Sequence, residues 1–87
     1  MSTPVLKLYA LSTCIHCRHT VEFLNENKIP YDLSYVDKLE GEERNKVLAE
    51  VRKYNPQTSF PTMVGLKNGS VVVGFQPELI KEKFANA

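Results

Sequence analysis

The stretch LYALSTCIHCRHTVEFL, residues 8–24, contains both cysteines of the chain, between a short apolar run and an amphipathic segment. The apolar run over residues 5–10 predicts a buried strand. Ser12 and Thr13 are residue types that cap helices, so we expect a helix over residues 14–27. The apolar side of this helix would consist of Cys17, Val21 and Leu24.

The middle of the chain continues this alternation of strand and helix. Residues 31–37 (YDLSYVD) follow Pro30 and have an alternating pattern that predicts a second strand. Residues 42–54 have one apolar side and one charged side, which is typical of a surface helix. The apolar side of this second helix would consist of Val47, Leu48, Val51 and Tyr54.

The last third predicts a hairpin followed by a final helix. After a loop over residues 55–61, two apolar runs (62–66 and 70–75) flank Asn68-Gly69, which favours a two-residue hairpin turn. Pro77 suits the first position of a helix whose inward side chains would be Ile80 and Phe84.

The predicted order is strand, helix, strand, helix, strand, strand, helix. Parallel strands need a crossover helix, whereas antiparallel strands can be joined by a tight turn. We therefore expect an α/β fold in one domain over residues 1–87, with a four-stranded mixed sheet flanked by three helices.

Composition limits the function classes. The net charge is +1, from 11 basic and 10 acidic residues, so no electrostatic feature favours nucleic acid or a membrane surface. Residues 1–14 lack a basic segment followed by a long apolar one, so no secretory signal is expected. This predicts a cytoplasmic protein, where thiols are kept reduced.

A structural disulfide and a metal site are two interpretations of the cysteine pair. A disulfide from Cys14 to Cys17 would close a loop of about four residues and contribute roughly 2 kcal/mol, without restraining any distant segment. A tetrahedral zinc site needs four ligands, and His16 and His19 are predicted to lie away from the cysteine face. A metal or iron–sulfur carrier would therefore need a site shared between two chains.

A redox-active dithiol is the third interpretation, and the one that the pattern favours. Residues i and i+3 of a helix lie close enough to approach disulfide geometry. Cys14 would lie at the helix start, where free N–H groups and the helix dipole favour a thiolate, and Cys17 would resolve the mixed disulfide. His16 and Thr13 are candidates for tuning this thiolate, whereas His19 is expected to be a surface residue.

The segment SFP (residues 59–61) opens the third predicted strand, and proline is tolerated at the first residue of a strand. In the expected topology this end of the strand, with Pro61, would lie beside the start of the first helix. With this proline, the sequence resembles the glutaredoxin branch of the thioredoxin superfamily over nearly its whole length. The matching segments are LYALSTCIHCRHTVEFL, SFP (where glutaredoxins usually carry Thr-Val-Pro) and VGFQPELI, which is similar to the Gly-Phe-x-Pro segment of NrdH-type redoxins.

The resemblance implies a thioredoxin fold, a cis bond before Pro61 and a dithiol-disulfide oxidoreductase that reduces protein disulfides. Cys14 would attack and Cys17 would release the product. The surface that receives the partner would consist of Thr13, Ile15, Ser59, Phe60, Pro61, Gly74 and Phe75. No bound cofactor or metal is expected, because the redox group is the disulfide itself.

Departures from the family pattern leave the electron donor open between thioredoxin reductase and glutathione. Ile15 and His16 replace the usual Pro-Tyr, and Gly74-Phe75 stands where glutaredoxins carry Gly-Gly before an acidic residue that grips glutathione. Candidate contacts to a glutathione carboxylate are Arg52, Lys53 and Gln57. Expected partners are protein disulfides, such as that of a ribonucleotide reductase, and the chain is expected to be monomeric. A glutathione-dependent glutaredoxin acting in deglutathionylation is the alternative enzyme.

Overall fold

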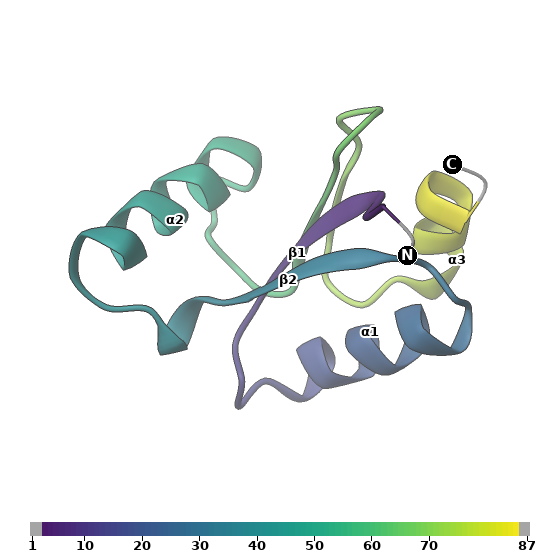
Figure 1. Cartoon of the computed structure of the whole chain (residues 1–87), viewed down its shortest axis with the longest axis horizontal. Coiled ribbons are helices and arrows are strands. Elements are labelled where there is room, and N and C mark those ends of the chain that lie inside the picture. Colours follow the sequence, from purple (N-terminus) through teal and green to yellow (C-terminus); the bar gives the residue numbers. More distant parts are fainter. Residues whose placement is uncertain (1–2, 86–87) are drawn as a thin grey trace.

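The computed structural model describes residues 3–85. Met1 and Ser2, the first residues of the N-terminal segment without a secretory-signal pattern, lie outside this range. The elements are β1 (Leu6–Ala10), α1 (Ile15–Glu26), β2 (Tyr31–Tyr35), the 3-10 helix η1 (Val36–Lys38), α2 (Gly41–Tyr54), β3 (Thr62–Gly65), β4 (Val71–Val73), α3 (Pro77–Ile80) and the π-helical η2 (Lys81–Ala85) (Figure 1). No helix in the described range is both long and apolar enough to cross a membrane.

The four strands form one mixed sheet in the order β2-β1-β3-β4. β1 pairs with β2 in parallel and with β3 in antiparallel orientation, and β3 pairs with β4 in antiparallel orientation. Leu8, at the centre, lies opposite Leu33 on one side and Met63 on the other. This confirms the predicted α/β fold, with its parallel first half and hairpin second half.

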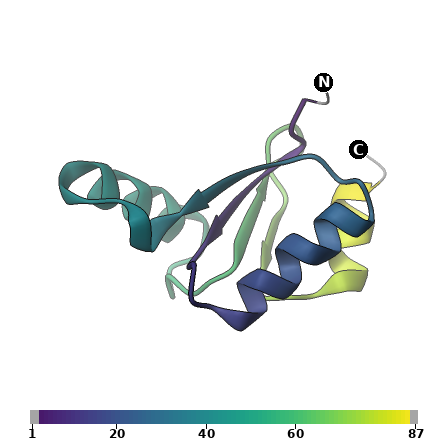
Figure 2. The same ribbon diagram turned by 60° about the horizontal axis from the view of Figure 1, so that its bottom comes forward.

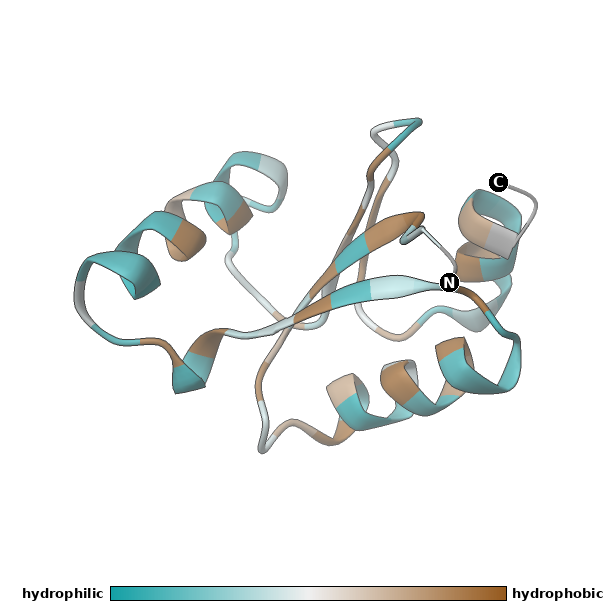
Figure 3. Cartoon of the chain, in the orientation of Figure 1, coloured by the Kyte–Doolittle hydropathy of each residue, from teal (hydrophilic) through white to brown (hydrophobic). Residues whose placement is uncertain are grey.

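Helices α1 and α3 cover one face of the sheet and α2 lies on the other (Figures 1 and 2). The apolar bands of α1 and α3 face the strands, whereas α2 is largely hydrophilic (Figure 3). The larger core, between the sheet and α1/α3, contains Leu6, Leu8, Ala10, Cys17, Leu24, Ile29, Met63, Val72, Ile80 and Phe84. Because Cys17 belongs to this core, one of the two cysteines is anchored in the interior of the fold.

The smaller core lies under α2 and consists of Tyr9, Val36, Val51 and Val64. The Tyr9 hydroxyl donates a hydrogen bond to the Glu50 carboxylate at 3.0 Å. Burial, followed by this bond, raises the pKa of Tyr9. Val47 and Leu48 are half-buried as expected for an inward side. Tyr54 is 40% exposed, but it lines a cavity with Tyr9 and Val64 on the same side of the helix.

Two features differ from the sequence-based expectation, the end of β2 and the β3–β4 connection. β2 ends at Tyr35 because the next residues turn into η1, which buries Val36. The β3–β4 connection is longer than two residues: the Gly65 N–H donates to the Ser70 carbonyl at 2.7 Å. Of the two predicted turn residues, only Gly69 adopts a positive φ, of 67°. The side-chain oxygen of Asn68 instead accepts a hydrogen bond from the Ser70 N–H. This side-chain bond replaces the left-handed backbone expected at Asn68.

Candidate functional site

The two cysteines lie at the start of α1, as the spacing predicts. Cys14 is the N-cap residue, with φ −88° and ψ 122°, and its sulfur accepts the Cys17 N–H at 3.3 Å. The N-cap position presents unpaired N–H groups and the positive end of the helix dipole to this sulfur. Cys14 is half-buried and Cys17 is only 1% exposed, so of the two thiols the first is the accessible one.

The buried thiol of Cys17 is held in its protonated form. Burial, and next a hydrogen bond with Cys14, raise the pKa of Cys17 to about 12. The Leu11 N–H, which donates to Cys17 Sγ at 3.5 Å, acts in the opposite direction but is outweighed. At neutral pH the reduced pair therefore carries a proton on Cys17.

β3 is the neighbour of β1 in the sheet, and β1 leads directly into the loop that carries Cys14. The segment before β3 therefore lies on one side of the cysteine pair. The Phe60–Pro61 peptide bond is cis, as the resemblance implies, and Pro61 is fully buried. Phe60 is half-buried and packs against both cores. The Gly74 N–H donates to the Pro61 carbonyl at 2.8 Å, so the structure brings Gly74 to this segment as predicted.

Asn55 fixes this segment and was read in the sequence only as part of a loop. It is 5% exposed, and its amide donates to the Ser59 carbonyl at 3.1 Å, Ser59 Oγ at 3.0 Å and Thr62 Oγ1 at 3.2 Å. Its carbonyl oxygen accepts the Gln57 N–H at 3.2 Å. An asparagine at the end of a surface helix indicates a turn, but nothing in the sequence indicates that its side chain is buried.

Replacing Asn55 by aspartate should destabilise the protein by about 1–3 kcal/mol, because a carboxylate cannot donate to these acceptors and is buried beside them. The same change at exposed Asn25, whose side chain accepts from the Tyr31 hydroxyl at 3.0 Å, is the matched control and should be near neutral. Urea unfolding monitored by circular dichroism measures both. Equal midpoints for the two variants would contradict the role assigned to Asn55.

The other residues predicted to contact the protein partner lie at or near the start of α1, with the exception of Phe75. Thr13, Ile15 and His16 are exposed at the first turn of α1, with Ile15 at 55%. Phe75 lies further along α1 than expected: its ring packs edge-on against Phe23 at 5.8 Å and stacks on that of His19 at 6.0 Å. His19 is exposed, as expected of a surface residue, but it also covers this aromatic contact.

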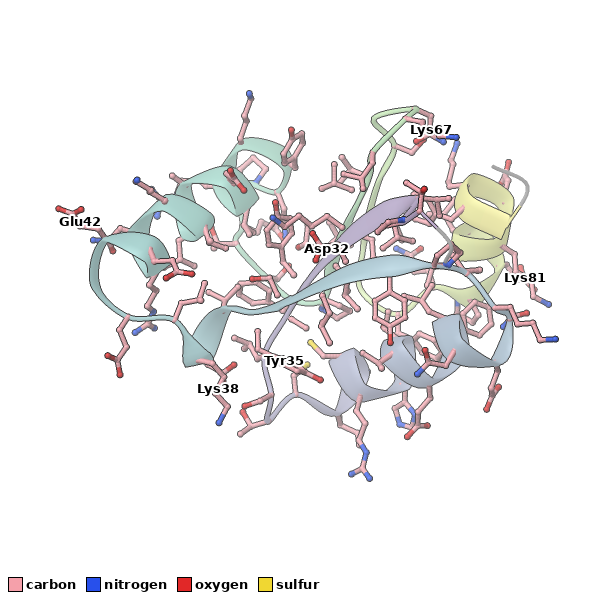
Figure 4. The ribbon with its side chains drawn as sticks, in the orientation of Figure 1. Asp32, Tyr35, Lys38, Glu42, Lys67 and Lys81 are labelled. Carbon is pink, nitrogen blue, oxygen red and sulfur yellow. The ribbon has the colours of Figure 1, made fainter. Side chains whose placement is uncertain are left out.

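A cavity of about 380 Å³ opens on the other side of Cys14, toward β2. Its lining residues are Leu11, Ser12, Cys14, Arg18, Val21, Glu22 and Tyr35. Tyr35, at the end of β2, lines this cavity together with Cys14 (Figure 4). All of the lining residues except Tyr35 belong to the segment around the two cysteines, and Tyr35 is brought to them by the pairing of β2 with β1, which the sequence pattern around Tyr35 does not indicate.

The remaining candidates lie elsewhere. Three candidates for a glutathione contact are exposed at and after the end of α2: Arg52, Lys53 and Gln57. The backbone N–H of Gln57 donates to the Asn55 side chain. Within residues 3–85, no three histidine, cysteine or acidic side chains gather in a way that could hold a metal ion.

A pair of free cysteines at a helix start, with a cis-proline directly before the neighbouring central strand of a mixed sheet, is typical of redox proteins of the thioredoxin fold. Comparison with known families refines this class: the Glutaredoxin family model matches residues 6–68. The chain belongs to the glutaredoxin family. A search of curated protein sequences found no significant match.

Solved structures agree with this assignment. The chain is similar to the glutaredoxin Grx-1 of Archaeoglobus fulgidus, with 37% identity, 93% of this chain and 86% of that chain covered, and a TM-score of 0.84. It is similar to methanoredoxin of Methanosarcina acetivorans, with 33% identity, coverages of 91% and 82%, and a TM-score of 0.84. A buckwheat glutaredoxin–glutathione complex shares the fold, at 14% identity, coverages of 90% and 67%, and a TM-score of 0.68.

Proposed function

We propose that this protein is a dithiol-disulfide oxidoreductase that reduces protein disulfides through Cys14 and Cys17. The observation that carries the proposal is the difference between the two thiols: Cys14 is half-exposed at the helix N-cap, and Cys17 is buried and protonated beneath it. Membership of the glutaredoxin family supports the same chemistry.

The proposed reaction has two exchange steps. The Cys14 thiolate attacks one sulfur of the substrate disulfide, forming a mixed disulfide and releasing the other substrate sulfur as a thiolate. Cys17 then loses its proton to solvent and attacks Cys14 Sγ, which forms the internal disulfide and releases the second substrate thiolate. The substrate gains two electrons, the protein loses two, and the released thiolates take up protons from solvent.

The partner surface would surround Cys14. Ile15 is an exposed apolar side chain at the helix start, and Thr13, Ser59, Phe60 and Gly74 complete the rim on the cis-proline side, while buried Pro61 fixes the backbone of this segment from below. Exposed His16 is proposed to favour the Cys14 thiolate when it is protonated. Phe75 acts indirectly, by packing against α1. We further propose that the chain works as a monomer in the cytoplasm, with a protein disulfide such as that of a ribonucleotide reductase as substrate.

A protein reductase of the thioredoxin reductase type is the proposed electron donor. Polar groups in the segment where related glutaredoxins grip glutathione form internal bonds in this chain. The Gly74 N–H is bonded to Pro61, and Gln76 Nε2 donates to the Val73 carbonyl at 2.6 Å. Fewer polar groups are thus left for a tripeptide.

The donor is tested by NADPH oxidation with insulin as substrate, once with thioredoxin reductase and once with glutathione and glutathione reductase. We expect turnover in the first assay and much slower turnover in the second. The reverse order would establish glutathione as the donor.

Deglutathionylation is the second candidate, favoured by the glutathione complex of the buckwheat protein, which shares this fold. It requires only Cys14, so it would survive replacement of Cys17 by serine. Measuring release of glutathione from a glutathionylated peptide by the Cys17→Ser variant separates the two functions: a fully retained rate would favour this candidate.

A further inference from the structure

Asp37, in η1, is bonded to the loop that connects β1 to α1. Its Oδ1 accepts the Ser12 backbone N–H at 2.9 Å, and its Oδ2 accepts the Ser12 hydroxyl. Ser12 is separated from Asp37 by 25 residues, so these bonds join two elements that are distant in sequence. Both carboxylate oxygens are thereby used to hold one residue of the loop.

This loop carries the groups that act on the two sulfurs. Leu11, directly before Ser12, donates its N–H to Cys17 Sγ, and Cys14 follows two residues after Ser12. The Cys14 N–H in turn donates to the Leu11 carbonyl at 3.2 Å. A shift of Ser12 would therefore move the donor to Cys17 and the N-cap sulfur together.

We propose that Asp37 is a positioning residue for thiol exchange, which holds the Cys14 loop through Ser12 and presents its negative charge to the Cys17 thiol. This inference rests on the proposed function. The position of Asp37 gives it two separable effects, one through its hydrogen bonds and one through its charge.

Asp37 is not placed to accept the Cys17 proton. Its two bonds to Ser12 lower the pKa of its carboxyl below the ordinary 3.8, so it stays ionised throughout the neutral range. Its charge instead adds the smallest of the contributions that raise the pKa of Cys17, after burial, the Cys14 hydrogen bond and the charge of Cys14. The ionisable groups in this region are Cys14, Cys17 and Asp37, with Lys38 next to Asp37 and with Arg18, Glu22 and Tyr35 lining the neighbouring cavity.

Asparagine at position 37 separates the two effects. Its carbonyl can accept the Ser12 N–H and its amide can donate to the Ser12 hydroxyl, so Asp37→Asn keeps the loop contacts and removes the charge. Asp37→Ala removes both. Asp32→Asn is the matched control, because Asp32 is an exposed acidic residue of β2 in the register position opposite Lys7, three residues before Tyr35 (Figure 4).

The test is the reaction of the reduced protein with one equivalent of 4,4′-dithiodipyridine, a disulfide that is neutral at neutral pH and releases an absorbing thiopyridone. The first phase reports attack by Cys14, and the second reports attack by Cys17 on the Cys14 mixed disulfide. Cys17→Ser should show the first phase alone. Two phases in the wild type, with one in Cys17→Ser, are required by the proposed function itself, whatever Asp37 does.

For Asp37→Asn we expect an unchanged first phase and a second phase that is faster by up to about twofold, because a lower pKa of Cys17 increases its thiolate fraction more than it reduces its nucleophilicity. The pH profile of the second phase should shift toward lower pH. For Asp37→Ala we expect a first phase slower by about three- to tenfold, because the loop loses its restraint. Asp32→Asn should match the wild type in both phases.

Two outcomes would overturn the proposal. A second phase in Asp37→Asn with the wild-type rate and pH profile would show that the charge does not reach Cys17. A first phase in Asp37→Ala equal to that of Asp37→Asn would show that the bonds to Ser12 do not hold Cys14 in place. Because Asp37 is exposed, loss of the fold is not expected, and circular dichroism of each variant checks this.

Discussion

Replacing Cys14 by serine should abolish disulfide reduction, with turnover falling by about a thousandfold or more, because a neutral hydroxyl cannot replace a thiolate as nucleophile. Insulin reduction with the physiological reductase measures the loss. Cys14 is half-buried at the helix N-cap and packs against the margin of the larger core, and serine is a preferred N-cap residue that differs from cysteine only in having oxygen in place of sulfur. The loss should therefore appear without a change in the unfolding midpoint.

Cys17→Ser is the internal comparison for this prediction. Its first turnover should proceed at close to the wild-type rate, and the reaction should then stop at the mixed disulfide, because the resolving thiol is absent. If Cys14→Ser retained turnover while Cys17→Ser had none in the first cycle, the roles assigned to the two cysteines would be reversed.

The second large effect is expected in the core. Leu24 is completely buried between α1 and the sheet, so Leu24→Ala should lower the free energy of unfolding by about 2–5 kcal/mol. In a chain of this size the melting temperature should fall by about 10 °C or more. Thermal unfolding followed by circular dichroism measures the change.

Leu66→Ala is the matched control, because it removes the same atoms from a side chain that is 53% exposed. Its stability should stay within about 0.5 kcal/mol of the wild type. A similar loss at both positions would mean that Leu24 is not packed as the structure shows.

The fold could be predicted because its information is local. The apolar runs around Leu8 and Met63, the helix patterns and the required crossover connections specify the mixed sheet and its three helices. Errors occur where a tertiary contact overrides a local preference. The predicted strand over residues 31–37 ends at Tyr35 because η1 turns Val36 into the core, and Asn68 uses its side chain where a left-handed backbone was expected.

The two redox-active cysteines of the candidate site could be predicted from the sequence, whereas the hydrogen bonds that hold the surrounding loops in place could not. Cys14 and Cys17 are recognised by their spacing, and Pro61 by its place before a strand. Asn55 and Asp37 are not part of any such pattern, because each acts through hydrogen bonds to residues that only the folded chain brings near. Polar residues are common in turns, so residue type alone does not show whether such a side chain is buried and hydrogen-bonded or exposed to solvent.

The central claim, that Cys14 attacks and Cys17 resolves, is tested most directly by trapping the mixed disulfide. Reduced Cys17→Ser and reduced Cys14→Ser are each mixed with insulin, quenched with acid and analysed by mass spectrometry under non-reducing conditions. We predict a covalent adduct with an insulin chain in Cys17→Ser and none in Cys14→Ser, where the remaining thiol is buried and protonated. An adduct in Cys14→Ser, with none in Cys17→Ser, would contradict this account.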